Sequence, residues 1–241
     1  MTPLRIAPGF DPRTGQAAFK RFGRLHIPDF LTAPSARALA DTIVRVTPWM
    51  RTINRGSDSF ELPVAEVEAY PPEEQQAFAN VVYGEARRGF QFLYDRWRLS
   101  VLAEAGEPVP PGLRAAYDFL NGPEFLGFAQ ALTGDTRPTF VDAQVTRYLP
   151  GHFLTSHNDS KPDAGRLYAY VLNLSPEWRA DWGGLLLFLD EDGHVAEGYT
   201  PAFNALNIFR VPANHAVSIV APFADAPRLA ITGWIRHGSV R

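Results

Sequence analysis

The sequence contains no cysteine among its 241 residues. This absence excludes disulfides, thiolate zinc sites, iron–sulfur clusters and cysteine nucleophiles. Any metal must therefore be held by histidine and carboxylate side chains, a donor set suited to iron, manganese, zinc or nickel. The formal net charge is only −3, so no basic field is present and no direct nucleic-acid partner is expected.

Long hydrophobic runs are also missing. The longest, such as residues 185–189, are far too short to span a bilayer. The N-terminal residues contain no apolar core of signal-peptide length. We therefore expect a cytoplasmic protein without a membrane partner. Its 46% hydrophobic and 20% charged residues are typical of a globular protein, and its length allows one large domain of unknown oligomeric state.

The N-terminal half is predicted to be mainly helical. Residues 1–18 contain proline and glycine breakers and predict an irregular arm, whereas residues 22–30 alternate as in a strand. Residues 49–63 predict a loop or irregular strand that forms an exposed connection, with a substrate-facing flap as the alternative. Helices are expected from Thr32 or Ser35 to before Pro48, from Pro71 through an aromatic stripe ending at Trp97, and at about 113–121 and 123–133. We interpret the stripe as core packing against a sheet.

After Gly134 the pattern changes to short β-rich runs separated by turn residues. Several short strands without intervening helices favour an antiparallel sandwich or barrel. We therefore predict an α+β protein with a mainly β core. The single domain would comprise the arm 1–18, an entry strand and supporting helices over 19–135, and a β core over 136–241. The expected strands are at 139–149, 167–174, 184–190, 205–211, 216–220 and 229–236.

A metal site is predicted around the His157-Asn158-Asp159 segment. In an extended backbone, residues two apart point to the same side, so His157 and Asp159 would project together. Such a pair arises often by chance and needs a third ligand. His215, which opens a late strand, is the candidate. Two histidines and one carboxylate on one face of a metal form the facial triad of non-haem Fe(II) oxygenases.

The other histidines are weaker candidates for ligands. His194 lies in an expected hairpin turn and His237 lies in the C-terminal tail. His152 follows the Pro150-Gly151 turn, where an exposed position or a supporting role beside the metal suits it better. His26, on the first strand, is expected to be a partly buried structural residue.

Arg228 lies thirteen positions after His215 and begins another expected strand. A strand starting there could run beside the His215 strand and direct a guanidinium into the same cavity. Arginine binds carboxylates through two parallel hydrogen bonds. A cosubstrate with a metal-chelating keto-acid head and a distal carboxylate matches 2-oxoglutarate. A solvated strand end is the alternative reading of Arg228.

Residues 144–236 resemble the catalytic core of 2-oxoglutarate/Fe(II)-dependent dioxygenases, in particular the branch with the hypoxia-factor and ribosomal prolyl hydroxylases. The resemblance lies in RYLPGHFLTSHND, LNLSPEWRADWGGLLLF, IFRVPANHAV and RLAITGWIRH. Residues 22–39 also resemble the entry strand and helix of that branch. The middle helices match poorly. The resemblance implies a double-stranded β-helix (jelly roll) over about 138–237, with the helix from Pro71 on its outer face.

The resemblance also implies roles for single residues. It makes His157, Asp159 and His215 iron ligands and Arg228 the anchor of the distal carboxylate. Fe(II), 2-oxoglutarate and O₂ would be required, and ascorbate is a candidate stimulant. Further residues expected to line or contact the cosubstrate pocket are Tyr148, Thr232, Trp234 and Val217. Lys161 and Arg166 are candidate substrate contacts next to the loop 160–165, whereas Trp178 and Trp182 are expected to pack at the sheet edge.

The implied reaction is hydroxylation of a C–H bond coupled to decarboxylation of 2-oxoglutarate to succinate and CO₂. A prolyl residue of a protein or peptide is the expected substrate, with a free amino acid or small metabolite as the alternative. Two further alternatives stay open: a cupin-like metal-dependent enzyme that is not an oxygenase, and a non-catalytic jelly-roll binding module. Fold-level analogy alone cannot choose among them.

Overall fold

Strands from both halves of the chain form one rolled antiparallel sheet in this computed structural model, which describes residues 3–46, 48–161 and 164–238. The hydrogen-bonded order is β1-β11-β8-β13-β6-β4-β7-β12-β9-β10, with the β2–β3 hairpin beside β4 and β5 beside β13. The strands are β1 (Arg24–Ile27), β2 (Met50–Arg55), β3 (Asp58–Pro63), β4 (Phe92–Trp97), β5 (Phe140–Val141), β6 (Gln144–Tyr148), β7 (Phe153–His157), β8 (Arg166–Asn173), β9 (Leu186–Leu189), β10 (Val195–Tyr199), β11 (Leu206–Arg210), β12 (His215–Val217) and β13 (Arg228–Arg236).

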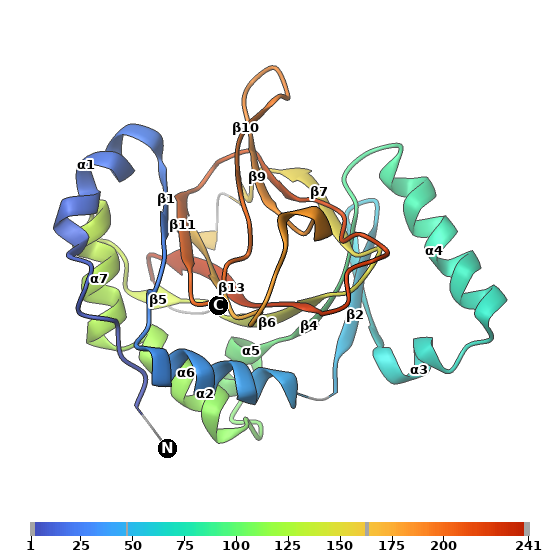
Figure 1. Ribbon diagram of the computed structural model, residues 1–241, viewed down its shortest axis with the longest axis horizontal. Helices are drawn as coiled ribbons and strands as arrows, with labels where there is room; N and C mark the ends of the chain where they lie inside the picture. The colour runs from blue at the N-terminus through green and yellow to red at the C-terminus, as the bar shows by residue number, and fades with distance from the viewer. Residues whose placement is uncertain (1–2, 47, 162–163, 239–241) are drawn as a thin grey trace.

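The sheet closes almost completely into a barrel, visible at the centre of Figure 1. The predicted double-stranded β-helix is therefore confirmed. Helices lie around it, with α1 and α7 on one side and α3 and α4 on the other (Figure 1). The helices are α1 (Pro12–Phe22), α2 (Ala33–Val44), α3 (Val64–Glu68), α4 (Pro72–Ala86), α5 (Leu99–Glu104), α6 (Pro111–Leu120) and α7 (Pro123–Thr133).

The largest hydrophobic cluster joins the helices to the outer face of the barrel. Phe19 of α1 and Phe125 of α7 are fully buried, and Phe125 packs edge-on against Tyr170 of β8. Burial of aromatic side chains contributes the largest area per residue to such a core. By contrast, α4 buries only Val82, which packs with Leu93 and Phe153. The helical side formed by α1, α2, α6 and α7 therefore supplies most of the support for the barrel.

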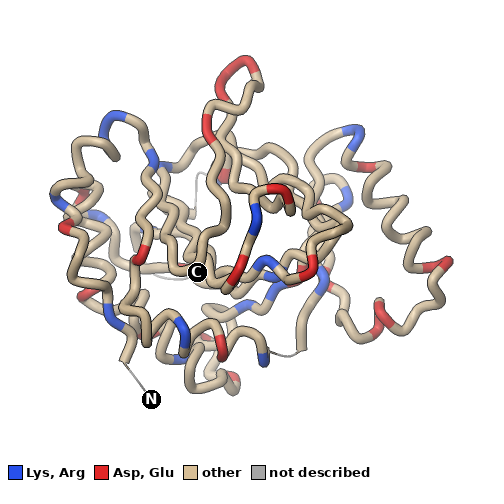
Figure 2. Tube along the Cα trace, viewed as in Figure 1, with Lys and Arg blue, Asp and Glu red and all other residues tan. Residues whose placement is uncertain are grey.

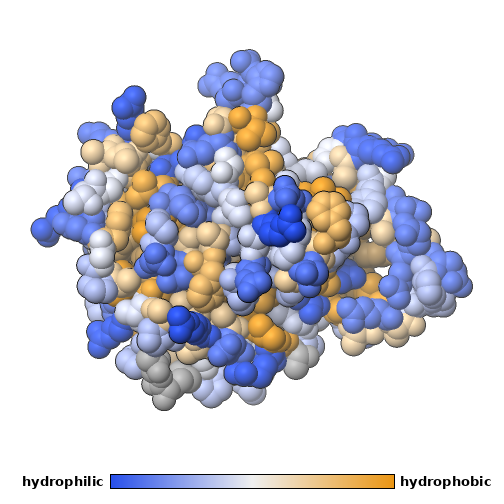
Figure 3. Space-filling model, in the orientation of Figure 1, coloured by the Kyte–Doolittle hydropathy of each residue, from blue (hydrophilic) through white to orange (hydrophobic). Residues whose placement is uncertain are grey.

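The surface carries interspersed charges of both signs, as Figure 2 shows along the chain trace. In the face drawn in Figure 3, hydrophobic side chains alternate with hydrophilic ones. None of the helices in the described part of the chain has the length and apolar character needed to cross a membrane.

Three predicted elements differ from the structure. Residues 12–22 form α1 within the expected irregular arm, with Asp11 accepting a hydrogen bond from the Arg13 N–H at the helix start. Residues 50–63 form a regular β-hairpin in place of an exposed connection. The helix expected from Pro71 ends at Ala86, and the part of the aromatic stripe from Leu93 to Trp97 belongs to strand β4. Gly89 interrupts the helical pattern, and the alternation of the residues after it favours a strand.

A buried row of charges crosses three strands behind the cavity wall. Arg51 on β2, Asp95 on β4 and Arg147 on β6 are paired in register across neighbouring strands. Asp95 is fully buried and accepts hydrogen bonds from Arg51 Nε at 2.9 Å and from Arg147 Nη2 at 2.7 Å. Burial alone would raise the pKa of Asp95, but the bonds from Arg51 and Arg147 hold it below its usual value. Removing one partner would leave a buried charge uncompensated.

Candidate active site

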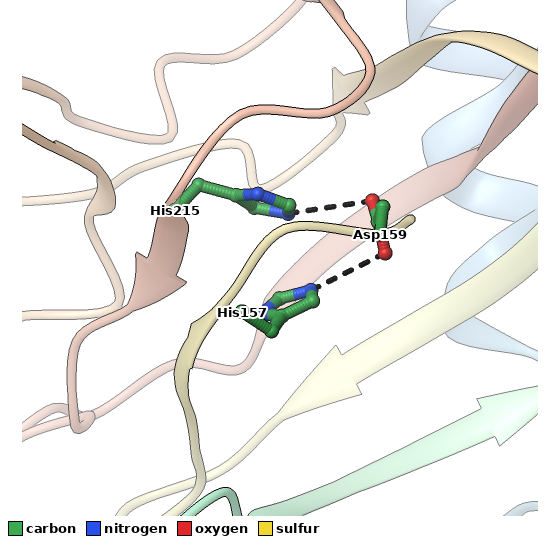
Figure 4. A group of neighbouring side chains, drawn as sticks. All are labelled: His157, Asp159 and His215. Atoms are coloured by element: carbon green, nitrogen blue, oxygen red, sulfur yellow. Dashed lines mark ion pairs between the residues drawn. The ribbon is translucent and has the colours of Figure 1, made fainter. Parts of the chain in front are cut away.

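The two histidines of the predicted triad are brought together by strand pairing. His157 ends β7 and His215 begins β12, and the two residues are direct partners in the antiparallel register. Asp159 lies just beyond β7, with its Oδ1 3.4 Å from His157 Nε2 and its Oδ2 3.5 Å from His215 Nε2. Figure 4 shows both rings directed at this carboxylate. The candidate ligand atoms all lie within 4.8 Å of one another, which is close enough to hold one ion.

The backbone at Asp159 differs from the expected extended conformation. Its φ is +61°, in the left-handed region that aspartate tolerates better than most residues. The strand ends at His157, and the turn directs the carboxylate back toward the imidazoles. The prediction that His157 and Asp159 share one side was right in outcome, but simple strand alternation was the wrong reason.

Both imidazoles are oriented for metal binding through the same nitrogen. His157 Nδ1 lies 3.1 Å from the Thr155 carbonyl oxygen, and His215 Nδ1 lies 2.8 Å from the Ala213 carbonyl oxygen. A carbonyl only accepts, so each Nδ1 carries the proton and each Nε2 presents its lone pair to the centre. Such outer hydrogen bonds fix tautomer and ring orientation in metal sites.

The protonation states also suit a metal. Burial, together with the nearby His157, lowers the pKa of His215 to about 4, so its imidazole is neutral at neutral pH. Burial alone would raise the pKa of Asp159, but its interactions with the adjacent His157 and His215 hold it below its usual value. Two imidazoles and one carboxylate are the donor set of the Fe(II) facial triad.

Arg228 enters the same cavity from the start of β13. The cavity has a volume of about 270 Å³, and both the triad and Arg228 line it. Arg228 is only 2% exposed, its guanidinium lies 5.0 Å from the centre of the Tyr148 ring, and its Nε has no hydrogen-bond partner among the described residues. Burial lowers the pKa of this guanidinium. A buried cation without a carboxylate partner is costly unless a bound anion supplies one.

The other arginines of β6 and β13 are already paired. Arg147 binds Asp95, and Arg236 lies 3.1 Å from Asp142. Neither lines the cavity. The expectation that the Arg228 strand runs beside the His215 strand was wrong, because β13 pairs with β6 and β8 whereas β12 pairs with β7 and β9. Arg228 reaches the cavity across the barrel.

The remaining predicted pocket residues all line the cavity: Tyr148, Val217, Thr232 and Trp234. The Thr232 hydroxyl already donates to the Tyr170 carbonyl at 2.8 Å, so it would have to rotate to donate to a bound carboxylate. Arg166 also lines the cavity; its guanidinium lies 3.4 Å from the Trp234 ring centre, and it donates to the Asp159 carbonyl. Lys161 is exposed and does not line the cavity, and residues 162–163 of the adjoining loop lie outside the described residues.

Strand β4 supplies cavity residues that the sequence interpretation missed. Phe92, Tyr94 and Arg96 alternate along β4 into the cavity. Tyr94 stacks on Tyr148, with ring centres 5.1 Å apart and an angle of 13°. The interpretation of the stripe as core packing alone is therefore wrong for Tyr94. The period of two of these β4 residues after Gly89 was the signal that could have identified them.

Gly183 and Gly184 allow a close approach of backbone to the Arg228 side chain. Gly184 has φ +62°, and a Cβ built there would lie 2.9 Å from Arg228 Cδ and 3.2 Å from Trp178. Trp178 donates to the Gly183 carbonyl and packs edge-on against Trp182, and neither tryptophan lines the cavity. The packing role expected for the two tryptophans is consistent with this geometry.

We expect Gly184→Ala to weaken 2-oxoglutarate binding about tenfold or more, because the new methyl group displaces the Arg228 stem and small misplacements are costly in a site. The measurement is the apparent KM for 2-oxoglutarate. Gly193→Ala is the matched control: Gly193 also has positive φ (+81°), but a Cβ there has no neighbour within 4 Å. Both variants should lose about 1–2 kcal/mol of stability. Equal KM values in the two variants would contradict the steric argument.

His152 is buried, contrary to the expectation of an exposed position. It is only 4% exposed, and its Nδ1 has no partner in the described part of the chain. Burial lowers its pKa to about 4. It does not line the cavity, so the sequence interpretation was right to leave it out of the metal site. His194 and His237 are exposed, and His26 is half-buried with Nδ1 2.6 Å from Asn207 Oδ1.

The buried neutral His152 predicts acid sensitivity. Its pKa in the folded state (about 4) is below the ordinary 6.5. When the pH falls below about 6.5, the unfolded chain therefore binds a proton at this group before the folded chain does, and the folded state loses stability. This one group should remove about 2 kcal/mol of stability between about pH 7.5 and about pH 5. Urea unfolding of wild type and His152→Asn at both pH values measures it. The variant should lose less stability on acidification, even if it is less stable at each pH; equal losses would contradict the prediction.

Comparison with known proteins bears on the family and the fold. The 2OG-Fe(II) oxygenase superfamily matches residues 143–236. Prolyl 3-hydroxylase OGFOD1 of Mus musculus is 33% identical over 119 residues, which is 46% of this chain and 21% of that protein. The match thus spans about a fifth of the length of this relative.

Two solved structures have the same fold. A Pseudomonas putida prolyl-4-hydroxylase has a TM-score of 0.60 at 18% identity, covering 95% of this chain and 100% of that one. A Trichoplax adhaerens prolyl hydroxylase, in complex with a hypoxia inducible factor oxygen degradation domain peptide, has a TM-score of 0.61 at 15% identity, covering 94% and 90%. At these identities the likeness concerns the fold. Residues 143–236 are thus similar to the 2OG-Fe(II) oxygenase superfamily, and the chain has the fold of solved prolyl hydroxylases.

Proposed function

We propose that this dioxygenase hydroxylates a prolyl residue of a protein or peptide, with Fe(II) held by His157, Asp159 and His215 and 2-oxoglutarate anchored by Arg228. The observation that carries the proposal is the presence, in one cavity, of a facial triad and of a buried guanidinium that has no carboxylate partner among the described residues. A metal-dependent enzyme without a dicarboxylate cosubstrate would have no use for that cation.

The residues present fit both groups. The triad offers two Nε2 lone pairs and a carboxylate on one side of the metal position, which leaves room for other ligands. When bound, Fe(II) with 2-oxoglutarate and O₂ supplies C–H hydroxylation coupled to decarboxylation of the cosubstrate to succinate and CO₂. The protein binds and orients the cosubstrate and the substrate and shields them from water.

The chain's own residues divide these tasks. The Thr155 and Ala213 carbonyls hold the protons on the Nδ1 atoms of His157 and His215, so both rings keep one orientation. Arg228 would form two charge-assisted hydrogen bonds with the distal carboxylate, in a place where burial strengthens them. The apolar wall of Tyr94, Tyr148 and Val217 would exclude water around the methylene groups of the cosubstrate.

The substrate class rests on similarity. The curated relative is a prolyl 3-hydroxylase, and one structural neighbour contains a bound peptide. Both support a prolyl residue within a polypeptide. A free amino acid or small metabolite is the competing substrate class, because the fold and the triad serve either one.

The test is to incubate the iron-loaded protein and 2-oxoglutarate with cell extract and search proteins and metabolites for the added mass of one oxygen atom. A prolyl residue modified only when iron and 2-oxoglutarate are both present supports the proposal. Modification of a free metabolite alone would overturn the polypeptide substrate and keep the chemistry. Succinate production that no extract component stimulates would argue against hydroxylation of either kind.

A further inference from the structure

An exposed aromatic ring stands at the mouth of the cavity. Phe90 lines the cavity yet is 46% exposed, whereas the triad and Arg228 are buried or half-buried. Its ring centre lies 5.5 Å from that of His157 and 5.7 Å from that of Phe92. Phe90 is therefore an exposed apolar surface next to the metal position. Because burying an aromatic ring is favourable, such a surface is suited to a partner.

The backbone that carries Phe90 is held by buried polar side chains. Asn54, on the β2–β3 hairpin, donates from Nδ2 to the Phe90 carbonyl and accepts from the Phe92 N–H, both at 2.9 Å. Gln91 is 1% exposed and donates from Nε2 to the Asn54 carbonyl at 2.8 Å. The side-chain amides of Asn54 and Gln91 therefore hold the backbone of this segment in place. Breaking their hydrogen bonds would be costly, because buried polar groups need hydrogen-bond partners.

Thr155 ties the same segment to the metal ligand. Its N–H and its hydroxyl both donate to the Gln91 carbonyl, at 2.9 and 3.0 Å, and the Gln91 N–H donates to the hydroxyl oxygen at 2.8 Å. The Thr155 carbonyl in turn orients His157. The position of Phe90 is thus coupled by hydrogen bonds to the orientation of a triad histidine. Rigid support of this kind is typical of binding residues.

Another part of the cavity lining differs in chemistry. There the Arg166 guanidinium lies 3.4 Å from the centre of the Trp234 ring and donates to the Asp159 carbonyl. The cavity lining therefore includes both a free aromatic ring and a fixed guanidinium on an indole. A saturated ring with an adjacent carbonyl suits these two groups, since its C–H groups pack on an aromatic face and its carbonyl accepts from a cation. A prolyl residue within a peptide has both groups.

We propose that Phe90 binds the target prolyl ring of the substrate and is the residue that sets the preference for a compact apolar ring next to the metal. This inference rests on the proposed function. It names a residue outside the segment with family resemblance (144–236), and its role depends on the Asn54, Gln91 and Thr155 network described above.

The test uses Mn(II) as a paramagnetic probe that does not support turnover, with 2-oxoglutarate present. A capped alanyl-prolyl-alanine peptide is titrated, and the relaxation of its prolyl ring protons is measured by NMR. In wild type, the bound Mn(II) should increase the relaxation rate of the prolyl ring protons. Phe90→Ala should bind the peptide about tenfold more weakly, the effect expected for loss of one aromatic contact, and Phe90→Tyr should bind within about twofold of wild type. Manganese and 2-oxoglutarate affinities, measured separately, should be unchanged in both variants.

Phe60→Ala is the matched control, because Phe60 is 45% exposed but does not line the cavity. Peptide affinity is also followed by chemical shift without metal, so the comparison does not depend on the triad. Equal binding by wild type and Phe90→Ala would overturn the inference and leave the proposed function standing. Binding of a capped alanyl-leucyl-alanine peptide in preference to the prolyl peptide would overturn both. If wild type binds neither peptide, the inference is overturned. If wild type does not bind Mn(II), the proposed function alone is overturned.

Discussion

Asp159→Ala should abolish iron-dependent turnover and remove most of the metal affinity. The carboxylate faces both imidazoles at 3.4 and 3.5 Å and is the only anionic group of the described metal cluster. Without it, a divalent ion would be held by two neutral rings. Metal content after iron loading and dialysis, together with succinate formation, measures both effects. Roughly 2.0–2.2 Å is the expected distance from each ligand atom to the metal in a loaded crystal.

The control for this change is Asp142→Ala. Asp142 is half-buried and paired with Arg236, but it does not line the cavity. It should lose stability without losing metal. Asp159→Asn separates charge from shape, because an amide keeps the size and one oxygen donor but removes the negative charge. Full iron content and full turnover in Asp159→Ala would show that the triad is wrongly assigned.

Arg228→Ala should raise the apparent KM for 2-oxoglutarate by orders of magnitude and leave metal binding nearly unchanged. The guanidinium is 2% exposed and lies on the Tyr148 ring, so the carboxylate it binds would be shielded from water. Deleting one partner of such a buried pair costs about 3–5 kcal/mol, which corresponds to a factor of about 10² or more. Anaerobic titration of the Fe(II) protein with 2-oxoglutarate, followed by its charge-transfer absorption, measures the affinity directly.

Arg228→Lys should recover only part of this loss, because an ammonium group cannot make the two-pronged contact. Arg236→Ala serves as the control on the same strand, since that side chain is bonded to Asp142 and lies outside the cavity. Its 2-oxoglutarate affinity should match that of wild type. If Arg228→Ala titrates like wild type, the carboxylate is held elsewhere.

The chemistry of the site could be predicted from the sequence because it depends on residue type. The lack of cysteine restricted the ligands to His and carboxylate, and His157, Asp159, His215 and Arg228 could then be chosen by their places at expected strand ends. The β-rich half could be predicted for the same reason, since its alternation and turn residues are local signals.

The arrangement in space could not be predicted, because register and barrel closure are long-range. Nothing near His157 indicates that His215 is its direct partner across β7 and β12. The same holds for Arg228, whose strand pairs with β6 and β8 and reaches the triad across the barrel. Strand β4 was missed because its aromatic residues continue the helical period of α4. Gly89, which lies between the two elements, was the signal of a break.

The buried row of Arg51, Asp95 and Arg147 has a consequence for how this enzyme could change its substrate. A slip of β4 by one residue would turn Asp95 into the cavity and leave two buried arginines without a counter-charge, so only one register is favourable. Phe92 and Tyr94 lie on the opposite face of the same strand, and their side chains are not needed to fix its register. The wall they form can accept exchanges of size and polarity while the strand stays in place. The scaffold is constrained on its outer side and open to evolutionary variation on its inner side, where selection for a new substrate would act.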